Sequence, residues 1–453
     1  MVSTKGKDIR ELALKYYGIH SSEWKTEGEP GDYQVWVEGK GCRVTDSTGK
    51  TYIDGFAGLM YKNIGYGRKE IADVAYEQMK KLTSVPTSSP APATESQVLL
   101  AEKLAQITPG SLSKTTYTSG GSESVETAVK IAKAYHKLNG QPGRYKLISR
   151  RGTYHGYTHL TMALMAQSPF TAAYEPLVYG VKQVSNVKCY RCDFNLTYPE
   201  CKLECARELE RMILAEGAET VAAVVMDPVS HSDIVTPPKP EYWPMIRSIC
   251  DKYGVLLIDD EVVTAFGRTG KMFGTENWDV VPDIMVTAKG ITSGYLPLGA
   301  VTVKEEVAEK FGAGFMHIIT FGGLPAPCAA ALKNIEIIER EKLPENAASV
   351  GAYLLEQLKA LMKRHVCIGD VRGIGLMTQT ELVANRETKE PLPREVTPQL
   401  RKRVQDNGLI ARIRSGMISI FPPLTFTRAE ADEAVGIVDK TLTEMEKDGK
   451  LPS

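Results

Sequence analysis

The chain has 453 residues, of which 43% are hydrophobic, and this length and composition favour a globular protein of two domains with a large core. Its 55 lysine and arginine residues balance 55 aspartate and glutamate residues, which excludes a global electrostatic attraction to nucleic acid or to an anionic membrane. The sequence shows no apolar run of 18 residues and no apolar signal core, so we expect a cytoplasmic protein.

The first predicted element is a β-hairpin over residues 38–55. Its turn, residues 46–49 (Asp-Ser-Thr-Gly), has the residue types that favour a reversal between two strands. From residue 68 to 324, helical stretches alternate with short apolar runs, which is typical of α/β units on a mostly parallel sheet. Ligands of such sheets bind beyond the carboxyl ends of the strands, where the chain carries a set of polar side chains: Ser122, Tyr154, Asp227 and Asp260.

Residues 115–133 predict a strand, a Gly-rich turn and a helix that begins near Ser122. Gly120 and Gly121 let the backbone approach a ligand, and the free N–H groups of a helix N-terminus favour a phosphate. An ordinary helix cap by Ser122 is the alternative. Further on, Tyr154 follows a strand, where its ring can stack on a flat cofactor or simply pack at the strand end.

Half of the eight cysteines fall within 17 residues: Cys189, Cys192, Cys201 and Cys205. Two close thiolate pairs can bind one Zn²⁺ ion or one [4Fe-4S] cluster. We therefore expect a structural metal site, with iron–sulfur slightly favoured, in an insertion at about residues 186–206. Two disulfides or four free thiols are the alternatives.

Asp260 ends an apolar run, and Lys289 follows it 29 positions later in TAKGITSGYLPLGA. A buried lysine can form a Schiff base with an aldehyde cofactor, and a carboxylate can keep a pyridine nitrogen protonated. Pyridoxal 5′-phosphate (PLP) needs both groups. Together with the phosphate cradle at Gly121, the pair predicts a PLP-dependent enzyme.

After Pro325 the pattern predicts a helix, then strands in 366–382 and 407–427, and a final helix from residue 428. We expect the hairpin to join this C-terminal part. The predicted division is an N-terminal segment of the small domain, a large PLP-binding domain and a C-terminal small domain, at residues 1–67, 68–324 and 325–453.

With these residues assembled, the chain resembles the class III (ω-) aminotransferases among the fold-type I PLP-dependent enzymes. The match covers nearly the whole chain, and its most specific parts are DEVVTAFGRTG, the AKG lysine and TFGGLP. The resemblance implies an α/β fold, with a mostly parallel sheet in the large domain and a smaller α+β domain. It also implies a homodimer or higher oligomer with active sites at the interface. The activity that it implies is ping-pong transfer of an amino group, through pyridoxamine phosphate, from an amine or ω-amino acid to a keto acid such as pyruvate.

The resemblance assigns roles to individual residues. Lys289 matches the Schiff-base lysine, which also acts as general base, and Asp260 matches the partner of the pyridine nitrogen. The other cofactor contacts are implied at Gly121, Ser122, Tyr154, His155, Val262 and the partner subunit's Thr320. The implied substrate contacts are Arg412, which would pair with a carboxylate, and Leu59, Met60 and Tyr154.

Other readings remain open from the sequence. Arg412 can be a solvated strand arginine, with Arg414 taking the carboxylate. An aminomutase or racemase of the same fold would use Lys289 and Asp260 alike. A metal-responsive protein on a PLP-enzyme scaffold would use the cysteines. The chain also departs from the usual family pattern at four positions that bear on the cofactor and substrate pocket: Met60, Gly120, Asp227 and Leu324.

Overall fold

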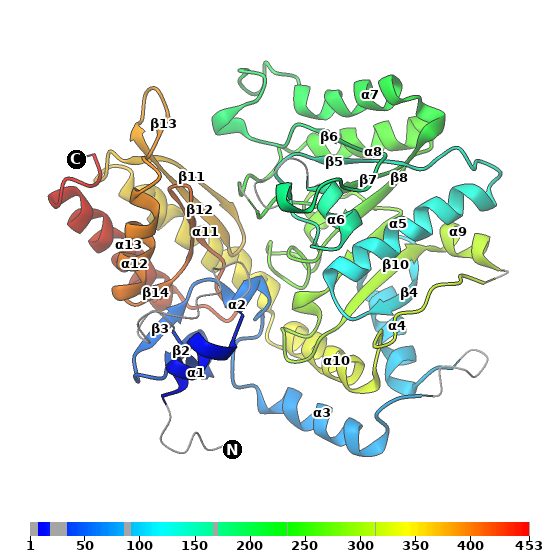
Figure 1. The fold of residues 1–453 in the computed structure, drawn as a ribbon, viewed down its shortest axis with the longest axis horizontal. Helices are drawn as coiled ribbons and strands as arrows, with labels where there is room; N and C mark the ends of the chain where they lie inside the picture. Colours follow the sequence, from blue (N-terminus) through cyan, green and yellow to red (C-terminus); the bar gives the residue numbers. More distant parts are fainter. Residues whose placement is uncertain are drawn as a thin grey trace.

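The computed structural model describes residues 8–18, 34–85, 92–165, 171–232, 234–312 and 314–452. Within the predicted N-terminal segment, residues 1–7 and 19–33 lie outside the described residues. Figure 1 shows two bodies side by side: a larger one around a central sheet, and a smaller one that carries β1–β3 together with β11–β16.

The larger body is built on a seven-stranded sheet whose β10 runs antiparallel to both of its neighbours, while the remaining neighbours pair in parallel. The buried runs VAAVVM and LLIDD form two adjacent central strands, as their apolar character predicts. In spatial order the strands are β4 (Leu112–Thr118), β10 (Gly299–Lys304), β9 (Ile284–Thr287), β8 (Leu256–Asp260), β7 (Val221–Met226), β5 (Lys146–Arg150) and β6 (Val181–Val184).

Helices cover this sheet. The predicted helix from Ser122 is α5, and it buries the apolar face formed by Val125, Ala128, Val129 and Ala132. Single 3₁₀ turns lie between the main elements at Ala172–Tyr174, Cys189–Arg191 (η3), Ala218–Thr220, Gly274–Trp278, Lys289–Ile291 (η6) and Glu309–Phe311. The helices in chain order are α3 (Lys69–Lys81), α4 (Glu95–Ile107), α5 (Gly121–Leu138), α6 (His159–Leu164), α7 (Glu204–Glu216), α8 (Tyr242–Tyr253), α9 (Glu305–Ala308) and α10 (Pro325–Arg340).

The smaller body contains two sheets. The predicted hairpin is present, and the Asp46 carboxylate accepts the backbone N–H of Thr48 at 2.9 Å inside its turn. Its strands, β1 (Trp36–Lys40), β2 (Arg43–Asp46) and β3 (Thr51–Asp54), form a sheet with the short parallel strand β14 (Leu409–Ile410). The second sheet has the order β11 (Ile368–Ile374), β12 (Met377–Asn385), β16 (Met417–Ile420), β15 (Arg412–Arg414), and β13 (Glu390–Pro391) pairs with β12.

The helices of the smaller body are α1 (Ile9–Tyr16), α2 (Ala57–Met60), α11 (Leu343–Leu361), α12 (Val396–Asp406) and α13 (Arg428–Lys447). Because β14 pairs with β3, the hairpin and the C-terminal part share one sheet. The division of the chain at residues 67 and 324 stays a prediction. None of the helices in the described ranges has the length and apolarity needed to cross a membrane.

Two features of this fold position the functional side chains. The parallel strands β5, β7 and β8 end at Arg150, Met226 and Asp260, so the loops that follow them meet at one edge of the sheet. The irregular segment α2 lies on the side of the smaller body that faces the larger one (Figure 1), and it interrupts helical geometry at Gly58, whose φ is 66°. Residues from both bodies can therefore line one space.

Candidate active site

A cavity of about 870 Å³ lies at the carboxyl ends of the parallel strands. Residues from both bodies line it, including α2 of the smaller body and the loops after β5 and β8. Every residue that the sequence predicts to contact the cofactor or the substrate, except Thr320, lines this cavity: Leu59, Met60, Gly121, Ser122, Tyr154, His155, Asp260, Val262, Lys289 and Arg412.

Asp260 is held rigidly at the end of β8. Its carboxylate contacts His155 Nδ1 at 2.6 Å and accepts the backbone N–H of Val262 at 3.1 Å. His155 is in turn fixed on its other ring nitrogen by the Thr153 hydroxyl at 3.0 Å. Because Asp260 is only 3% exposed, its charge faces a low-dielectric site, where it interacts strongly with an opposite charge.

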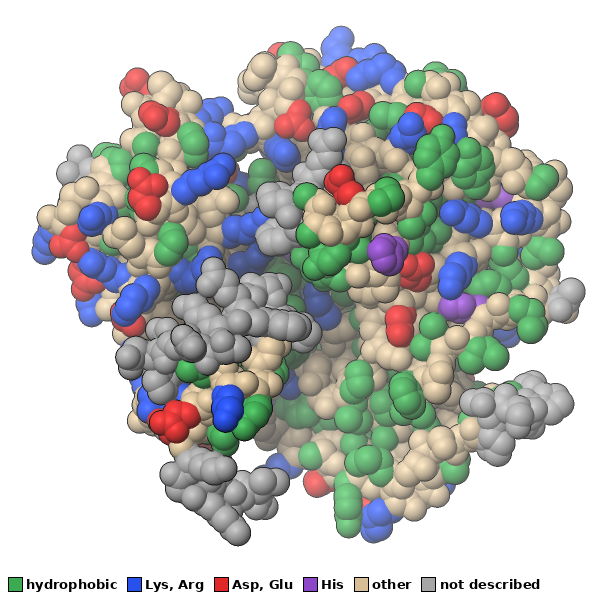
Figure 2. All heavy atoms as spheres, viewed as in Figure 1, with side chains coloured by type: hydrophobic (Ala, Val, Ile, Leu, Met, Phe, Trp, Pro, Cys, Tyr) green, Lys and Arg blue, Asp and Glu red, His purple; other side chains and the backbone are tan. Residues whose placement is uncertain are grey.

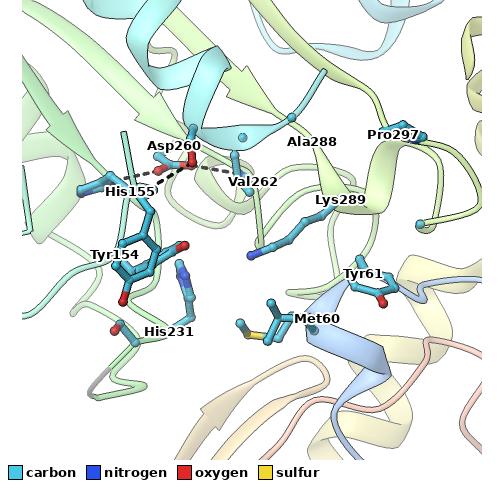
Figure 3. Close-up of a pocket in the computed structure, with 18 of the residues that line it drawn as sticks. Met60, Tyr61, Tyr154, His155, His231, Asp260, Val262, Ala288, Lys289 and Pro297 are labelled. Carbon is cyan, nitrogen blue, oxygen red and sulfur yellow. Dashed lines mark hydrogen bonds and ion pairs between the residues drawn. The ribbon is translucent and has the colours of Figure 1, made fainter. Parts of the chain in front are cut away.

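Lys289 begins the 3₁₀ turn η6, directly after β9, with a φ of 46°. In Figure 3 its side chain extends into the cavity from the side opposite Tyr154. Burial in the cavity, together with the positive charge of Arg412, lowers the pKa of the Lys289 amine to about 8, although Asp260 acts in the other direction. A lysine in this state supplies neutral, nucleophilic amine near neutral pH.

The N-terminus of α5 forms one end of the cavity. A side chain at Gly120 would meet nothing within 4 Å, which leaves open space beside the first turn of the helix. The Ser122 hydroxyl lies in the same place and accepts the backbone N–H of Tyr157 at 3.2 Å. Gly156 must be glycine here, because its φ is 128° and a Cβ would lie 2.4 Å from the Ser122 oxygen.

These residues fit PLP. The cavity offers an amine of lowered pKa, a carboxylate fixed by two hydrogen bonds and an open helix N-terminus, which match the aldehyde, the pyridine nitrogen and the phosphate. Tyr154 and Val262 offer an aromatic and an aliphatic surface for a flat ring (Figure 3).

Of the remaining predicted residues, Arg412, Met60 and Leu59 line the cavity and Thr320 does not. Arg412 lines the cavity and donates Nη1 hydrogen bonds to the backbone carbonyls of His231, at 2.8 Å, and of Ser232. Met60 is buried and Leu59 is exposed, both within α2. Thr320 is exposed on the same subunit and does not line the cavity.

Sequence reasoning missed several residues that line the cavity, and His231 is one of them. It lies in the loop after β7, is only 4% exposed and packs edge-on against the Tyr154 ring, with centroids 6.2 Å apart. Its neighbour Asp227 forms a buried ion pair with Arg150 at 2.6 Å. The spacing Asp227-x-x-x-His231 was the available signal, but a lone histidine in a loop has no periodicity that marks it.

The structure does not bear out the predicted metal site. Cys189 lies in the turn η3 and Cys205 in the first turn of α7, and all four cysteines of the cluster are free thiols. Burial, with a smaller effect of the neighbouring thiols, raises the pKa of Cys205 to about 12. Among the described residues, no group of three or more His, Cys, Asp or Glu side chains is arranged to hold a metal ion.

Comparisons with known proteins agree with this geometry. The family model described as aminotransferase class III matches residues 28–442. The chain is 40% identical to the uncharacterized aminotransferase YhxA of Bacillus subtilis, over 91% of this chain and 92% of the relative. It is 36% identical to the taurine–pyruvate aminotransferase of Bilophila wadsworthia, over 97% and 98%. An (S)-enantioselective ω-transaminase from Thermomicrobium roseum has a crystal structure that superposes with a TM-score of 0.91 at 41% identity, covering 96% of this chain and 98% of the other.

Proposed function

The chain belongs to the class III aminotransferases, which are PLP-dependent enzymes of fold type I, and we propose that it moves an amino group from an amine or ω-amino acid to pyruvate. The observation that carries the proposal is that Lys289 and the fixed carboxylate of Asp260 line one cavity. The name of the Bilophila relative supports pyruvate as the acceptor. PLP, when bound, supplies the electron sink for the charge that develops at the reacting carbon.

In this proposal, Lys289 acts as the general base. Its lowered pKa leaves a useful fraction of neutral amine near neutral pH, so it can take the proton from the substrate carbon that bears the amino group. The same amine returns a proton in the second half-reaction, when the keto acid receives the amino group.

Asp260 would hold a proton on the pyridine nitrogen. His155 and the Val262 N–H fix the carboxylate, so it is preorganised and does not need to reorient during the reaction. Ser122 and the first turn of α5 would bind the phosphate. Tyr154 and Val262 would bound the two faces of the ring.

Arg412 would bind the carboxylate of the keto acid. Its Nη1 contacts to two backbone carbonyls orient the guanidinium at the cavity wall. We expect Arg412→Ala to raise KM for pyruvate at least about tenfold, because a bidentate ion pair is lost, and to change the half-reaction with a carboxylate-free amine much less. If Arg412→Ala slows both half-reactions equally, Arg412 has a structural role and Arg414 becomes the residue that binds the substrate carboxylate.

A homodimer belongs to the same proposal. Thr320 is exposed in a segment that also exposes Met316, Ile318 and Phe321, by 98%, 77% and 63%, and such a group of exposed apolar side chains supports a neighbouring subunit. In the dimer, the partner subunit's Thr320 would reach the phosphate. The molecular mass in solution tests the dimer, and the PLP affinity of Thr320→Ala tests the role of Thr320.

Cell fractionation tests the predicted cytoplasmic location.

The direct experiment is a panel of amines and ω-amino acids assayed with pyruvate and with 2-oxoglutarate. Turnover that requires both a donor and a keto acid supports the aminotransferase. Product from a single substrate, without a keto acid, would favour the aminomutase or racemase instead. Lys289→Ala should bind PLP weakly, without the visible absorbance of the lysine-linked cofactor, and should show no turnover.

The metal site predicted from the four cysteines is outside this proposal. Metal analysis of protein purified without oxygen is its test. Zinc or iron near one equivalent would show that the thiols gather around an ion when it binds.

A further inference from the structure

Two arginines that line the active-site cavity, Arg401 and Arg414, have no role in the reaction as proposed. Arg412 and Arg414 both belong to β15, and the buried Ile413 lies between them. Because successive side chains of a strand point to opposite faces, the two arginines share the face that Ile413 does not, and both line the cavity. Arg401 comes from α12, and its guanidinium donates a hydrogen bond to the Ile413 carbonyl at 2.9 Å, which holds it beside β15.

The groups that line the cavity carry more positive than negative charge. Among the described residues that line it, Asp260 is the only carboxylate, whereas Lys289 and the three arginines are basic. Figure 2 shows lysine and arginine side chains in the hollow between the two bodies. In the proposed reaction Asp260 serves the pyridine nitrogen, the N-terminus of α5 the phosphate and Arg412 the keto acid. The positive charge of Arg401 and Arg414 therefore favours a further acid group on a substrate.

The two arginines of β15 act on different parts of the cavity. Burial lowers the pKa of Lys289 to about 8, and the positive charge of Arg412 contributes to this decrease. Burial raises the pKa of Tyr157, which is 45% exposed, and there it is the charge of Arg414 that acts in the opposite direction. Since two strand residues span roughly 7 Å, an acid group bound by Arg414 lies several bonds farther from the Lys289 amine than one bound by Arg412.

Arg412 is fixed at one distance from the reacting carbon. Its Nη1 donates hydrogen bonds to the backbone carbonyls of His231, at 2.8 Å, and of Ser232. A guanidinium anchored in this way suits the carboxylate next to the carbonyl carbon of a keto acid. An acid group at the far end of an amino donor needs a second cation, and the fork of an arginine matches the oxygens of such a group.

We propose that Arg414, supported by Arg401, forms a second anion-binding site that selects amino donors with an acid group remote from the amine. The inference rests on the proposed aminotransferase function and names the part of its donor class that the enzyme prefers: ω-amino acids and aminoalkylsulfonates over plain amines. One arginine then serves the keto acid and another serves the donor, so neither has to move between the two half-reactions.

The experiment compares donors that differ only in whether the chain ends in an acid group or in a methyl group. ω-Amino acids of about three to six carbons, a range set by the roughly 7 Å span of two strand residues, are assayed against n-alkylamines with the same number of carbons, with pyruvate as acceptor. We expect kcat/KM for the best ω-amino acid to exceed that of its alkylamine at least about tenfold, the effect of one hydrogen bond to a charged group. Aminoalkylsulfonates of the same lengths show which acid group the site prefers.

Variants of Arg414 test the assignment. Arg414→Gln keeps much of the side chain but removes its charge, so the preference for the acid donor should fall at least about tenfold, through KM. Arg414→Lys keeps the charge without the fork and should restore part of the preference. A preference that is the same in wild type and Arg414→Gln would overturn the proposal.

Lys402→Gln is the matched control for charge. Lys402 lies next to Arg401 in α12, its side chain is 77% exposed, and it is not among the residues that line the cavity. Its substitution removes one positive charge outside the cavity, so the preference should stay at the wild-type value. An equal loss of preference in Lys402→Gln and Arg414→Gln would show a diffuse electrostatic effect and overturn the site.

Two further measurements separate this site from other roles of Arg414. Conversion of the bound cofactor by the donor alone, followed by absorbance without keto acid, should show the same preference and the same loss in Arg414→Gln. If Arg414→Gln raises KM for pyruvate or for 2-oxoglutarate as much as for the acid donor, Arg414 serves the acceptor and the proposal fails. An enzyme that turns over none of the donors would refute the proposed function, whereas equal turnover of acid donors and alkylamines would refute only the second anion-binding site.

Discussion

The chemistry of the Lys289 amine depends on where its proton sits. Burial in the cavity lowers its pKa to about 8, whereas an ordinary lysine titrates near 10.4. Above pH 8 the amine is mostly neutral and nucleophilic, so its reactivity should rise through this value and then level off. Labelling of the PLP-free protein with a limiting amine-reactive reagent, read out by peptide mass spectrometry, should give a midpoint near pH 8 for Lys289. Exposed lysines in the same digest are the internal control, and a midpoint above 10 at Lys289 would contradict the assigned burial effect.

Asp260 acts through its charge, not through cofactor affinity. We expect Asp260→Asn to bind PLP, because the phosphate contacts near Ser122 do not depend on the carboxylate, and to lose at least about a hundredfold in kcat. Absorbance of the bound cofactor and steady-state kinetics measure the two effects separately. A kcat close to wild type would mean that another carboxylate holds the pyridine nitrogen.

Among individual residues, the sequence predicts the functional ones that lie in a recognisable sequence segment and misses those that do not. Lys289 and Asp260 follow buried strands within recognisable segments, so the sequence alone identifies both. His231 becomes visible only when the loop after β7 meets Tyr154, 77 positions earlier in the chain. The cysteines show the opposite case: they are close in sequence, yet among the described residues they do not form a metal-binding arrangement.

Among the elements, two helical glycines in the smaller body give a matched test of packing. A Cβ at Gly351 in α11 would lie 2.0 Å from the Gly375 carbonyl oxygen, whereas a Cβ at the exposed Gly436 in α13 meets nothing within 4 Å. Gly351→Ala should cost about 1–3 kcal/mol of stability through overpacking. Gly436→Ala should gain up to about 1 kcal/mol, because alanine favours the helix.

Denaturant unfolding of the two variants measures both effects under one condition. Stabilisation of the protein by Gly351→Ala would show that α11 can move away from the turn before β12.

At the element scale the sequence predicts α5 and α13 well, because each has a continuous apolar stripe. It does not predict α2, whose irregular turn depends on contacts between the two bodies rather than on local preference.

For the molecule as a whole, a buried pair of carboxyl groups next to Asp260 links stability to pH. Burial raises the pKa of both Asp259 and Glu261, that of Asp259 well above its usual value because it also faces the Glu261 charge. The folded protein therefore binds more protons here than the unfolded chain once the pH exceeds about 4. The contribution of the two protonated carboxyl groups to the free energy of unfolding is fully present below that pH, and it is lost as the pH rises through the folded-state pKa values.

Asp259→Asn removes this titration and can still hydrogen bond to Glu261. We expect the melting temperature of the variant, relative to wild type, to be higher at pH 8.5 than at pH 5. Asp279→Asn, an exposed position, is the control and should show no such change. An Asp259→Asn curve parallel to that of wild type across this range would show that the pair does not titrate on unfolding.

The two-residue strand β14 has a consequence for how the protein is made. Ile53 in β3 finds its parallel partner, Leu409, only after about 350 further residues have been synthesised. At about 5–20 residues per second, the ribosome takes on the order of tens of seconds to deliver that partner. During this interval the nascent hairpin exposes the edge of β3, a surface that invites pairing with another chain. The last hundred residues are therefore needed to cover the edge of the first β-strands to be synthesised. A chain whose synthesis stops before them keeps this edge exposed, which makes the fragment prone to aggregation and a substrate for chaperones.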